Sequence, residues 1–318
     1  MEPKEPSFEK INYSLRPNKN VQRKLVVQLL NDVLKLPGLR QDEYQYVGMG
    51  SPWFTDFVLM HRALDIKKMI SIEREMGRAR RMRFNLPFSN IKLRIGPTTE
   101  VLPRINLARP TVIWLDYDDE LKNYMFEDIG IVLKRLKSGS ILILTVNAEF
   151  DQLEHVETEG TLLSPENVLH SIAGDSVPSS IQDRLNKTGF ASLVAEIFAN
   201  AIRSKLLERR LDFAPFFNFS YKDGVRMVTF GGMVADKELR VEIQAQNLGK
   251  KFSWIASNGQ TNLQLPHLTF KEKLRFDELL PARQPPSPSK LGFELKGEEI
   301  RQYSSYYLLY PVFAEWLP

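Results

Sequence analysis

Short runs of apolar and β-branched residues recur along the first half of the chain, and the segments between them place apolar residues at helical spacing. Because the runs are almost continuously apolar, they predict strands that are covered on both faces. Alternation of such strands with helices is typical of a parallel, doubly wound α/β sheet with right-handed crossovers. The predicted strands are 44–47, 69–73, 91–95, 111–116 and 140–146, and two of the predicted helices are 53–64 and 124–136.

A different pattern follows later in the chain. Residues 216–221 and 225–230 resemble two strands joined through Lys222-Asp-Gly224. An Asp-Gly pair between two such runs is the strongest short signal for a hairpin. One of the two strands must then run antiparallel to the rest. The sequence therefore predicts a Rossmann-like sheet of parallel strands with a late hairpin that contributes one antiparallel strand.

The segment before this sheet predicts a helix that runs to about residue 36 and is capped by Asn18 or Asn20. One stripe of apolar residues recurs every four positions and should pack on the core. The members of this stripe are Val21, Leu25, Leu29 and Val33.

The pattern divides the chain into several parts. The predicted parts are an N-terminal helical segment (1–43), the Rossmann-like domain (44–236) with a helical insertion at about 150–212, and a C-terminal extension (237–318). The insertion is expected to cover the substrate side of the sheet. Within the extension, 239–255 predicts further strand, 281–290 a loop and the aromatic-rich 303–316 core packing.

The first predicted strand runs directly into a Gly-x-Gly turn formed by Gly48 and Gly50. Two glycines at this place allow a sharp turn above the sheet and a close approach of the backbone to a ligand. Glu73 ends the neighbouring strand, within reach of two ribose hydroxyls. A tight turn alone would be unremarkable in function, but its combination with Glu73 favours a nucleoside site.

The class of nucleoside follows from what the turn lacks. A dinucleotide fingerprint needs a third glycine beside the pyrophosphate, and that position holds Trp53. The sequence contains no Gly-x4-Gly-Lys-Ser/Thr loop, which disfavours phosphoryl transfer from a nucleoside triphosphate. S-adenosylmethionine is the remaining common ligand of such a sheet.

Composition agrees with this reading without deciding it. The 318 residues are 43% hydrophobic and 26% charged, which is ordinary for a globular protein of one or two domains. We expect a cytoplasmic protein, because there is no cysteine, no long apolar span and no signal peptide. The four histidines are scattered, so no zinc site is predicted.

The net charge of +4 is unevenly distributed. Five arginines follow Glu73 closely, and they either cradle a phosphate-bearing acceptor or form a solvated helix face. They are Arg74, Arg78, Arg80, Arg81 and Arg83. Arg16 and Lys19, at the positive end of the first predicted helix, either receive the carboxylate of the cofactor or of an acidic substrate, or are surface charges. Nucleic acid is not favoured as a partner, because no nucleic-acid-binding motif accompanies these charges.

Five motifs together resemble class I S-adenosylmethionine-dependent methyltransferases, and within that class the bacterial "putative O-methyltransferases", over about the first 235 residues. The motifs are Arg16-Pro-Asn-Lys19, Tyr46-Val-Gly-Met-Gly-Ser51, Ser71-Ile-Glu73, Phe84-Asn-Leu-Pro-Phe88 and Trp114-Leu-Asp-Tyr-Asp118. The resemblance implies the roles of the matching residues. Gly48, Gly50 and Ser51 would line the methionine and ribose, Glu73 would hold the ribose, Thr98 would lie near the adenine, and Asp116, Tyr117 and Asp118 would face the sulfonium and the acceptor.

The implied reaction is methyl transfer to an oxygen or nitrogen of a small-molecule or phosphate-bearing acceptor, in which Asp116 or Asp118 takes a hydroxyl proton. Two positions depart from the class, since Tyr46 stands where most members have an acid and Pro52 replaces a glycine. These departures keep two alternatives open. One is a catalytically silent module that binds a nucleoside or organises a partner, and the other is a nucleic-acid methyltransferase.

A metal-dependent variant of the reaction is also considered. Methyltransferases of the catechol type place an Asp after the fourth strand and an Asp-Asn pair after the fifth, where this chain has Asp116 and only Asn147, although Asp118 could substitute for the missing acid. Because one carboxylate is missing from that pair, we predict transfer without a metal.

Overall fold

The computed structural model describes residues 16–154, 156–158, 160–256 and 259–312. Its centre is an eight-stranded sheet in the order β10-β8-β9-β5-β4-β1-β2-β3. Every described pairing in this sheet is parallel except those of β9, so the predicted mixed sheet with one antiparallel strand is confirmed. The strands are β1 (Gln45–Met49), β2 (Lys68–Glu73), β3 (Ile91–Ile95), β4 (Thr111–Asp116), β5 (Ile141–Asn147), β8 (Asp212–Lys222), β9 (Arg226–Ala235) and β10 (Thr261–Leu263).

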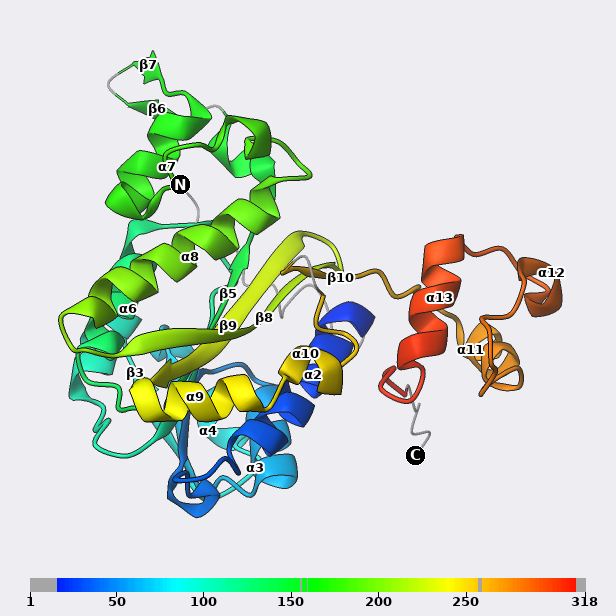
Figure 1. Cartoon of the computed structure of the whole chain (residues 1–318), viewed down its shortest axis with the longest axis horizontal. Coiled ribbons are helices and arrows are strands. Elements are labelled where there is room, and N and C mark those ends of the chain that lie inside the picture. The colour runs from blue at the N-terminus through cyan, green and yellow to red at the C-terminus, as the bar shows by residue number, and fades with distance from the viewer. Residues whose placement is uncertain (1–15, 155, 159, 257–258, 313–318) are drawn as a thin grey trace.

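Helices cover both faces of the sheet, as the continuous apolarity of the strands predicted (Figure 1). Alternate residues of β4 enter separate cores, with Trp114 on one face and Leu115 on the other. On the Trp114 face lie α2 (Pro17–Val33), α3 (Thr55–Leu64), α4 (Ala79–Phe84) and α9 (Lys237–Ala245). On the Leu115 face lie α5 (Thr98–Val101), α6 (Asn123–Leu133), α7 (Pro165–Ala173) and α8 (Phe190–Leu207).

The β8–β9 hairpin forms where the Asp-Gly pair predicted it, with Lys222 opposite Arg226. Gly224 in its turn has φ +134°, a conformation that side-chain-bearing residues rarely adopt. The acid of the pair has a second structural role. The backbone N–H groups of Asn18 and Lys19 donate to the carboxylate of Asp223 at 3.2 and 2.8 Å.

These two bonds correct the predicted start of α2. The helix begins at Pro17, and no side chain caps it from its own N-cap residue, Arg16. The side chain of Asn18 instead bonds Asp223 and the backbone at Leu265. Asp223 satisfies the first N–H groups of the helix and complements its positive end. The predicted stripe of apolar residues on α2 is confirmed, since all four are at most 1% exposed.

The insertion contains a small hairpin (β6, Glu157–Thr158; β7, Thr161–Leu162) together with α7 and α8. The helical character predicted for the insertion is confirmed by α7 and α8, and α8 packs on β8, β9 and α6. The strand predicted over 239–255 is wrong, because that segment forms α9 and α10 (Leu248–Lys251). Asp236 caps α9 by accepting from Leu239 at 2.9 Å, and Leu239 and Ile243 are buried one turn apart.

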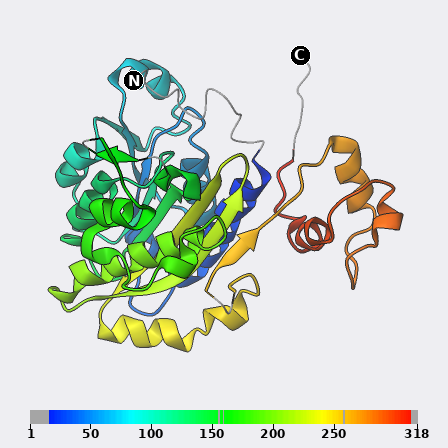
Figure 2. The same ribbon diagram turned by 90° about the horizontal axis from the view of Figure 1, so that it is seen from above.

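The rest of the extension contributes β10, which pairs with β8, and then a small helical lobe. The lobe comprises α11 (Phe270–Asp277), α12 (Pro288–Leu291) and α13 (Gly297–Tyr306), and it stands beside the main body (Figure 2). Tyr303 and Tyr310 are at most 2% exposed, so the predicted core packing is confirmed for them, while 313–318 lie outside the described residues. The division of the chain into domains stays a prediction.

Among the described residues, no helix is both long and apolar enough to cross a membrane.

Candidate functional site

The carboxyl ends of the five parallel strands β1 to β5 meet at one edge of the sheet. From β1 the chain moves outward to β2 and β3, and then returns to the other side of β1 to form β4 and β5. The strand order therefore reverses between β1 and β4. Open α/β sheets bind ligands in the crevice at such a point. We call this place the switch edge, and Gly48, Glu73 and Asp116 lie at or near the strand ends that form it.

The two glycines stand at the switch edge, but the chain does not turn there. Gly48 lies within β1, and the N–H of Gly50 continues the ladder by donating to the carbonyl of Ile72 at 2.6 Å. The turn follows at Ser51, whose carbonyl accepts from the N–H of Phe54 at 3.1 Å, before α3 begins. The prediction that the glycines themselves form the turn is therefore wrong, and neither has a positive φ.

Packing inside the protein explains both glycines. A Cβ at Gly48 would lie 2.5 Å from the hydroxyl oxygen of Tyr46, whose buried ring lies on the same face of β1. A Cβ at Gly50 would lie 2.8 Å from both Ser71 Oγ and Met82 Cε. A larger residue at either position would disturb the sheet itself. Substitution of these glycines therefore cannot isolate a contact with a ligand.

Glu73 ends β2 and is only 8% exposed. Its Oε1 accepts from the backbone N–H of Glu75 at 3.2 Å. Burial raises the pKa of Glu73 above its ordinary value, although that N–H and Arg78 partly oppose the shift. A carboxylate that has lost water in this way gains most from further hydrogen-bond donors, and a pair of ribose hydroxyls supplies them.

Asp116 ends β4 and anchors a buried group of charges from three elements. Lys19 of α2 is 1% exposed, and its Nζ lies 3.0 and 2.8 Å from the two carboxylate oxygens of Asp116. Arg23, one helical turn later, has Nη2 at 3.5 Å from Asp116 and pairs through Nε with Asp56 of α3. Two cations thus face two carboxylates beneath the switch edge. We call Lys19, Arg23, Asp56 and Asp116 the buried charge cluster.

Tyr46 lies beside this cluster, at the position where most class I members have an acid. Its ring packs edge-on against Phe57 at 4.9 Å. Burial first, and then the charges of Asp56 and Asp116, raise the pKa of Tyr46 well above its ordinary value. The residue therefore presents a neutral hydroxyl in place of a carboxylate. Arg16, the other predicted substrate residue, is half-buried at the N-cap of α2.

Thr98 and Tyr117 are brought together by a residue that the sequence analysis missed. Thr98 Oγ1 and the Tyr117 hydroxyl both donate to Oδ2 of Asp128, at 2.5 and 2.8 Å. Asp128 is fully buried on α6, and its Oδ1 has no hydrogen-bond partner among the described residues. The sequence could have indicated this residue, because Asp128 lies among the apolar residues of a predicted helix. An acid at a buried position needs hydrogen-bond partners.

The remaining acidic residues lie on the loop after β4. Asp118 is exposed and Asp119 is partly buried. The carbonyl of Asp119 accepts from the backbone N–H of Asn147 at 3.1 Å, and Asn147 Oδ1 accepts from the N–H of Glu149 at 2.8 Å. Within the part of the chain that the structure describes, no group of three or more His, Cys, Asp or Glu side chains could hold a metal ion.

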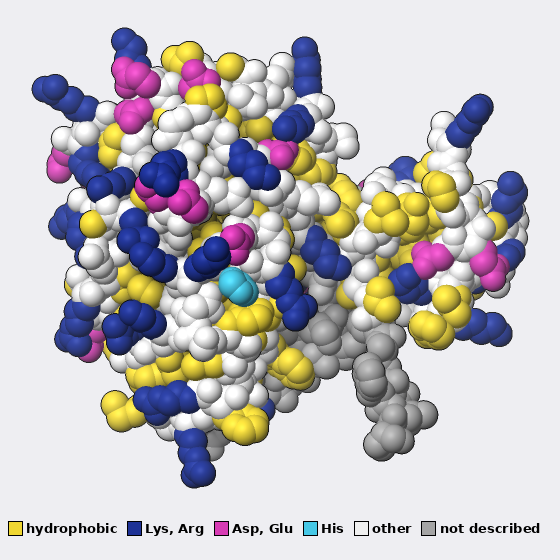
Figure 3. Space-filling model, turned by 90° about the horizontal axis from the view of Figure 1, so that it is seen from below, with side chains coloured by type: hydrophobic (Ala, Val, Ile, Leu, Met, Phe, Trp, Pro, Cys, Tyr) yellow, Lys and Arg dark blue, Asp and Glu magenta, His cyan; other side chains and the backbone are white. Residues whose placement is uncertain are grey.

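Of the arginines after Glu73, Arg74 directly follows β2, and the other four lie on η3 (Met76–Arg78) and α4. Four of the five are exposed, while Arg78 is half-buried and pairs with Glu75 at 3.3 Å. Viewed from below, the molecule carries basic side chains across its main body rather than in one compact patch (Figure 3). The exposed arginines are Arg74, Arg80, Arg81 and Arg83.

We expect Asp128→Ala to lower the free energy of unfolding by about 1–3 kcal/mol for each of the two hydroxyls that lose their acceptor. Asp128→Asn keeps an acceptor oxygen and should cost less. Urea unfolding of the two variants and the wild type measures the difference. Equal stability of Asp128→Ala and the wild type would show that the three side chains do not stabilise one another.

The same carboxyl predicts a pH dependence. Burial raises the pKa of Asp128 above its ordinary 3.8, against the opposing hydrogen bonds from Thr98 and Tyr117. The folded protein therefore holds this proton more tightly than the unfolded chain does, so the resulting stability is present below pH 3.8 and lost as pH rises through the raised pKa. Asp128→Asn lacks this titration. Its unfolding free energy relative to the wild type should rise with pH from about 4 and then level off.

Residues 11–317 match the family described as "Putative O-methyltransferase". The chain belongs to this family. The match spans the N-terminal helix, the sheet and the C-terminal lobe. No curated protein matches this methyltransferase family member.

Several solved structures share its general shape at low identity. Trm1 from Pyrococcus horikoshii, in complex with S-adenosyl-L-methionine, is 15% identical with a TM-score of 0.48 over 72% of this chain and 57% of that chain. The O-methyltransferase TomG from Streptomyces achromogenes is 15% identical with a TM-score of 0.39 over 71% of this chain and 91% of that chain. The Methanococcus jannaschii fibrillarin pre-rRNA processing protein is 15% identical with a TM-score of 0.37 over 70% and 78%.

The family member thus spans less than two thirds of the Trm1 chain. Identities this low, with TM-scores below 0.5, carry no information about its own ligand.

Proposed function

We propose that the protein transfers a methyl group from S-adenosylmethionine to an oxygen of an acceptor molecule, with the cofactor bound at the switch edge. The observation that carries this proposal is the gathering of Gly48, Glu73 and Asp116 at the ends of adjacent parallel strands. Membership of an O-methyltransferase family supports the reaction class. A cytoplasmic location, predicted from the lack of cysteine, belongs to the same proposal.

The residues present at the switch edge fit this cofactor. Glu73 is a buried carboxylate at the end of β2, where two ribose hydroxyls would offset its lost hydration. The backbone from Gly48 to Ser51 would line the ribose and methionine. Thr98, held by Asp128, would border the adenine, and Tyr117, held by the same carboxylate, would lie toward the sulfonium. When bound, the cofactor supplies a sulfonium-activated methyl group.

The contribution of the chain to the reaction is chiefly alignment, which can lower a barrier by about 7–11 kcal/mol when both reactants are held in line. Asp116 is held in place by the Nζ of Lys19, so it can orient the sulfonium and the acceptor without moving. Asp118 is exposed on the loop that follows and is the better placed of the two to take a proton from an acceptor hydroxyl. Arg16 remains a candidate for an acidic part of the substrate.

Calorimetry with S-adenosylmethionine and S-adenosylhomocysteine tests the binding site. Incubation with a panel of hydroxyl-bearing acceptors, followed by detection of S-adenosylhomocysteine, tests the reaction. Binding with turnover of a small hydroxyl compound supports the proposal. Cofactor binding without turnover on any small acceptor or RNA favours the silent module. Turnover on RNA alone favours a nucleic-acid methyltransferase. Absence of cofactor binding refutes the switch-edge assignment.

For an acceptor that gives turnover, we expect a chelator to leave the rate unchanged, because Asp116 is paired with Lys19 and Asn147 Oδ1 accepts from the N–H of Glu149. Asp118→Asn should lower kcat about 10²–10⁴-fold, the usual contribution of a positioned base, while changing cofactor affinity little. Asp119→Asn on the same loop is the matched control. Loss of activity with chelator and its return with Mg²⁺ would instead support a metal mechanism.

A further inference from the structure

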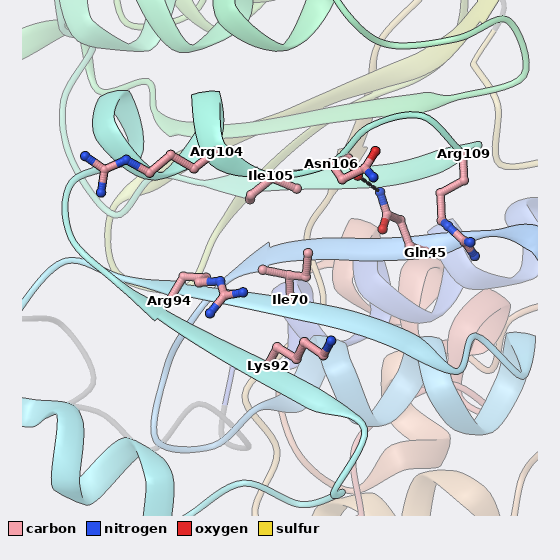
Figure 4. A pocket seen from close by; sticks show the side chains of 8 residues that line it. All are labelled: Gln45, Ile70, Lys92, Arg94, Arg104, Ile105, Asn106 and Arg109. Atoms are coloured by element: carbon pink, nitrogen blue, oxygen red, sulfur yellow. Dashed lines mark hydrogen bonds between the residues drawn. The ribbon is translucent and has the colours of Figure 1, made fainter.

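A second cavity lies beside the sheet, away from the glycines and the buried charge cluster. Its volume is about 260 Å³, below the usual range of about 300–1,000 Å³ for small-molecule sites. One wall is the Leu115 face of β2 and β3, and the other is the segment 104–109 (Figure 4). An adjoining cavity of about 300 Å³ shares Arg94 and Arg104 and reaches Ile95, next to the loop that carries Thr98.

The lining of the first cavity is strongly basic. Lys92 and Arg94 alternate on β3 and so stand on one face of this edge strand. Arg104 and Arg109 come from the two ends of the opposite wall, so both walls of the cavity carry cations (Figure 4). No Asp or Glu is among the residues that line it. We call the cavity that these four side chains line the cationic cavity.

The wall that carries Arg104 is held rigidly. Arg135 donates through Nη1 to the carbonyls of Pro103 and Ile105 at 3.0 and 2.9 Å, and through Nη2 to that of Leu102 at 2.6 Å. Gln45, 6% exposed, donates to the carbonyl of Asn106 at 2.7 Å. The backbone of the wall is therefore positioned before any ligand arrives, which lowers the entropy cost of binding.

The charges of the cationic cavity have few partners within the chain. Among the described residues, Lys92, Arg94 and Arg104 make no ion pair, and Arg109 donates to the backbone carbonyl of Glu43 at 3.4 Å. Charged side chains on an edge strand can serve to prevent pairing with other sheets. That role would account for Lys92 and Arg94 on β3. It would not account for Arg104 and Arg109 on the facing wall.

We propose that the cationic cavity binds phosphate groups of a phosphate-bearing ligand. Arginine guanidinium groups match the oxygens of phosphate in pairs, and cations on both walls suit a ligand with more than one negative charge. The small volume admits phosphate groups and leaves the rest of the ligand outside. Such phosphates belong either to a free polyphosphate compound or to the backbone of a single-stranded nucleic acid. The inference does not depend on the methyl-transfer proposal.

The test uses the full chain and two ligands, tripolyphosphate by calorimetry and a short fluorescent oligouridylate by anisotropy. The pocket variant is Arg94→Ala/Arg104→Ala, at two exposed positions that should not affect folding. The matched control, Lys250→Ala/Arg283→Ala, removes the same charge from exposed sites on α10 and the loop before α12. Circular dichroism and urea unfolding, unchanged in both variants, confirm intact folding.

We expect the pocket variant to bind at least about tenfold more weakly, and the control to match the wild type. If oligouridylate is the tighter ligand, its salt slope should fall by about 1.4 in the pocket variant, which identifies a nucleic-acid backbone. If tripolyphosphate is the tighter ligand, a free polyphosphate compound is identified. Absence of binding by both ligands, or an equal loss in the control variant, would overturn the proposal.

Discussion

Glu73→Ala should weaken the binding of S-adenosylmethionine at least about tenfold, the largest effect on affinity that we expect from a single side chain. The wild-type carboxylate would make two charge-assisted hydrogen bonds to the ribose, each contributing about 1.5–3 kcal/mol. Because burial already raises the pKa of Glu73, the ionised group does not favour folding, and its removal should change stability by no more than about 1 kcal/mol. Calorimetry and urea unfolding measure the two quantities separately.

Two further variants make this test specific. Glu73→Gln keeps one acceptor oxygen without its charge and should show an intermediate affinity. Glu75→Ala is the matched control, since Glu75 is exposed, lies two residues away and forms a partly exposed pair with Arg78 at 3.3 Å. Unchanged affinity in a folded Glu73→Ala protein would refute the ribose assignment, whatever the later steps of the reaction.

Lys19→Met should have the largest effect on stability, a loss of about 3–5 kcal/mol. The substitution leaves Asp116 with only Arg23, whose Nη2 lies 3.5 Å away and whose Nε already pairs with Asp56. The buried charge cluster would then hold one carboxylate too many. The midpoint of urea unfolding measures the loss, and the slope checks that both proteins unfold in the same way.

A double variant separates the charge imbalance from the loss of packing. Lys19→Met/Asp116→Asn restores neutrality and should recover more than about half of the stability lost in Lys19→Met. Lys251→Met is the control, because it breaks an exposed pair with Asp32 beside the same helix and should cost no more than about 1 kcal/mol. Equal losses of unfolding free energy in Lys19→Met and Lys251→Met would show that the buried Lys19–Asp116 pair stabilises the fold no more than an exposed pair does.

Most of the fold prediction rested on patterns within short stretches of sequence. The hairpin follows from the Asp-Gly pair at Asp223, and the buried stripe of α2 follows from spacing along one helix. The segment 239–255 was predicted wrongly because its apolar residues fit a strand as well as a short helix. The structure forms a helix there, which Asp236 caps and which buries one face.

The order of elements also located the candidate site, since the carboxyl ends of parallel strands must share one edge. What order could not supply is the surroundings of each side chain. The two glycines were predicted to form a turn that approaches a ligand. In the structure Gly48 makes room for Tyr46, and Gly50 makes room for Ser71 and Met82. The reason is that space beside a backbone depends on neighbouring strands and helices rather than on the chain around the glycine.

The sequence by itself determined the sheet class, the hairpin and the row of candidate residues, because each depends on spacing within a few turns or strands. Only the tertiary structure decided which charged and polar groups meet. Lys19 and Asp116 are 97 positions apart, Lys19 and Asp223 are 204 apart, and Thr98 and Asp128 are 30 apart. A buried charge must find a partner, and the choice among many acids and bases is made by packing of distant elements, which no local pattern encodes.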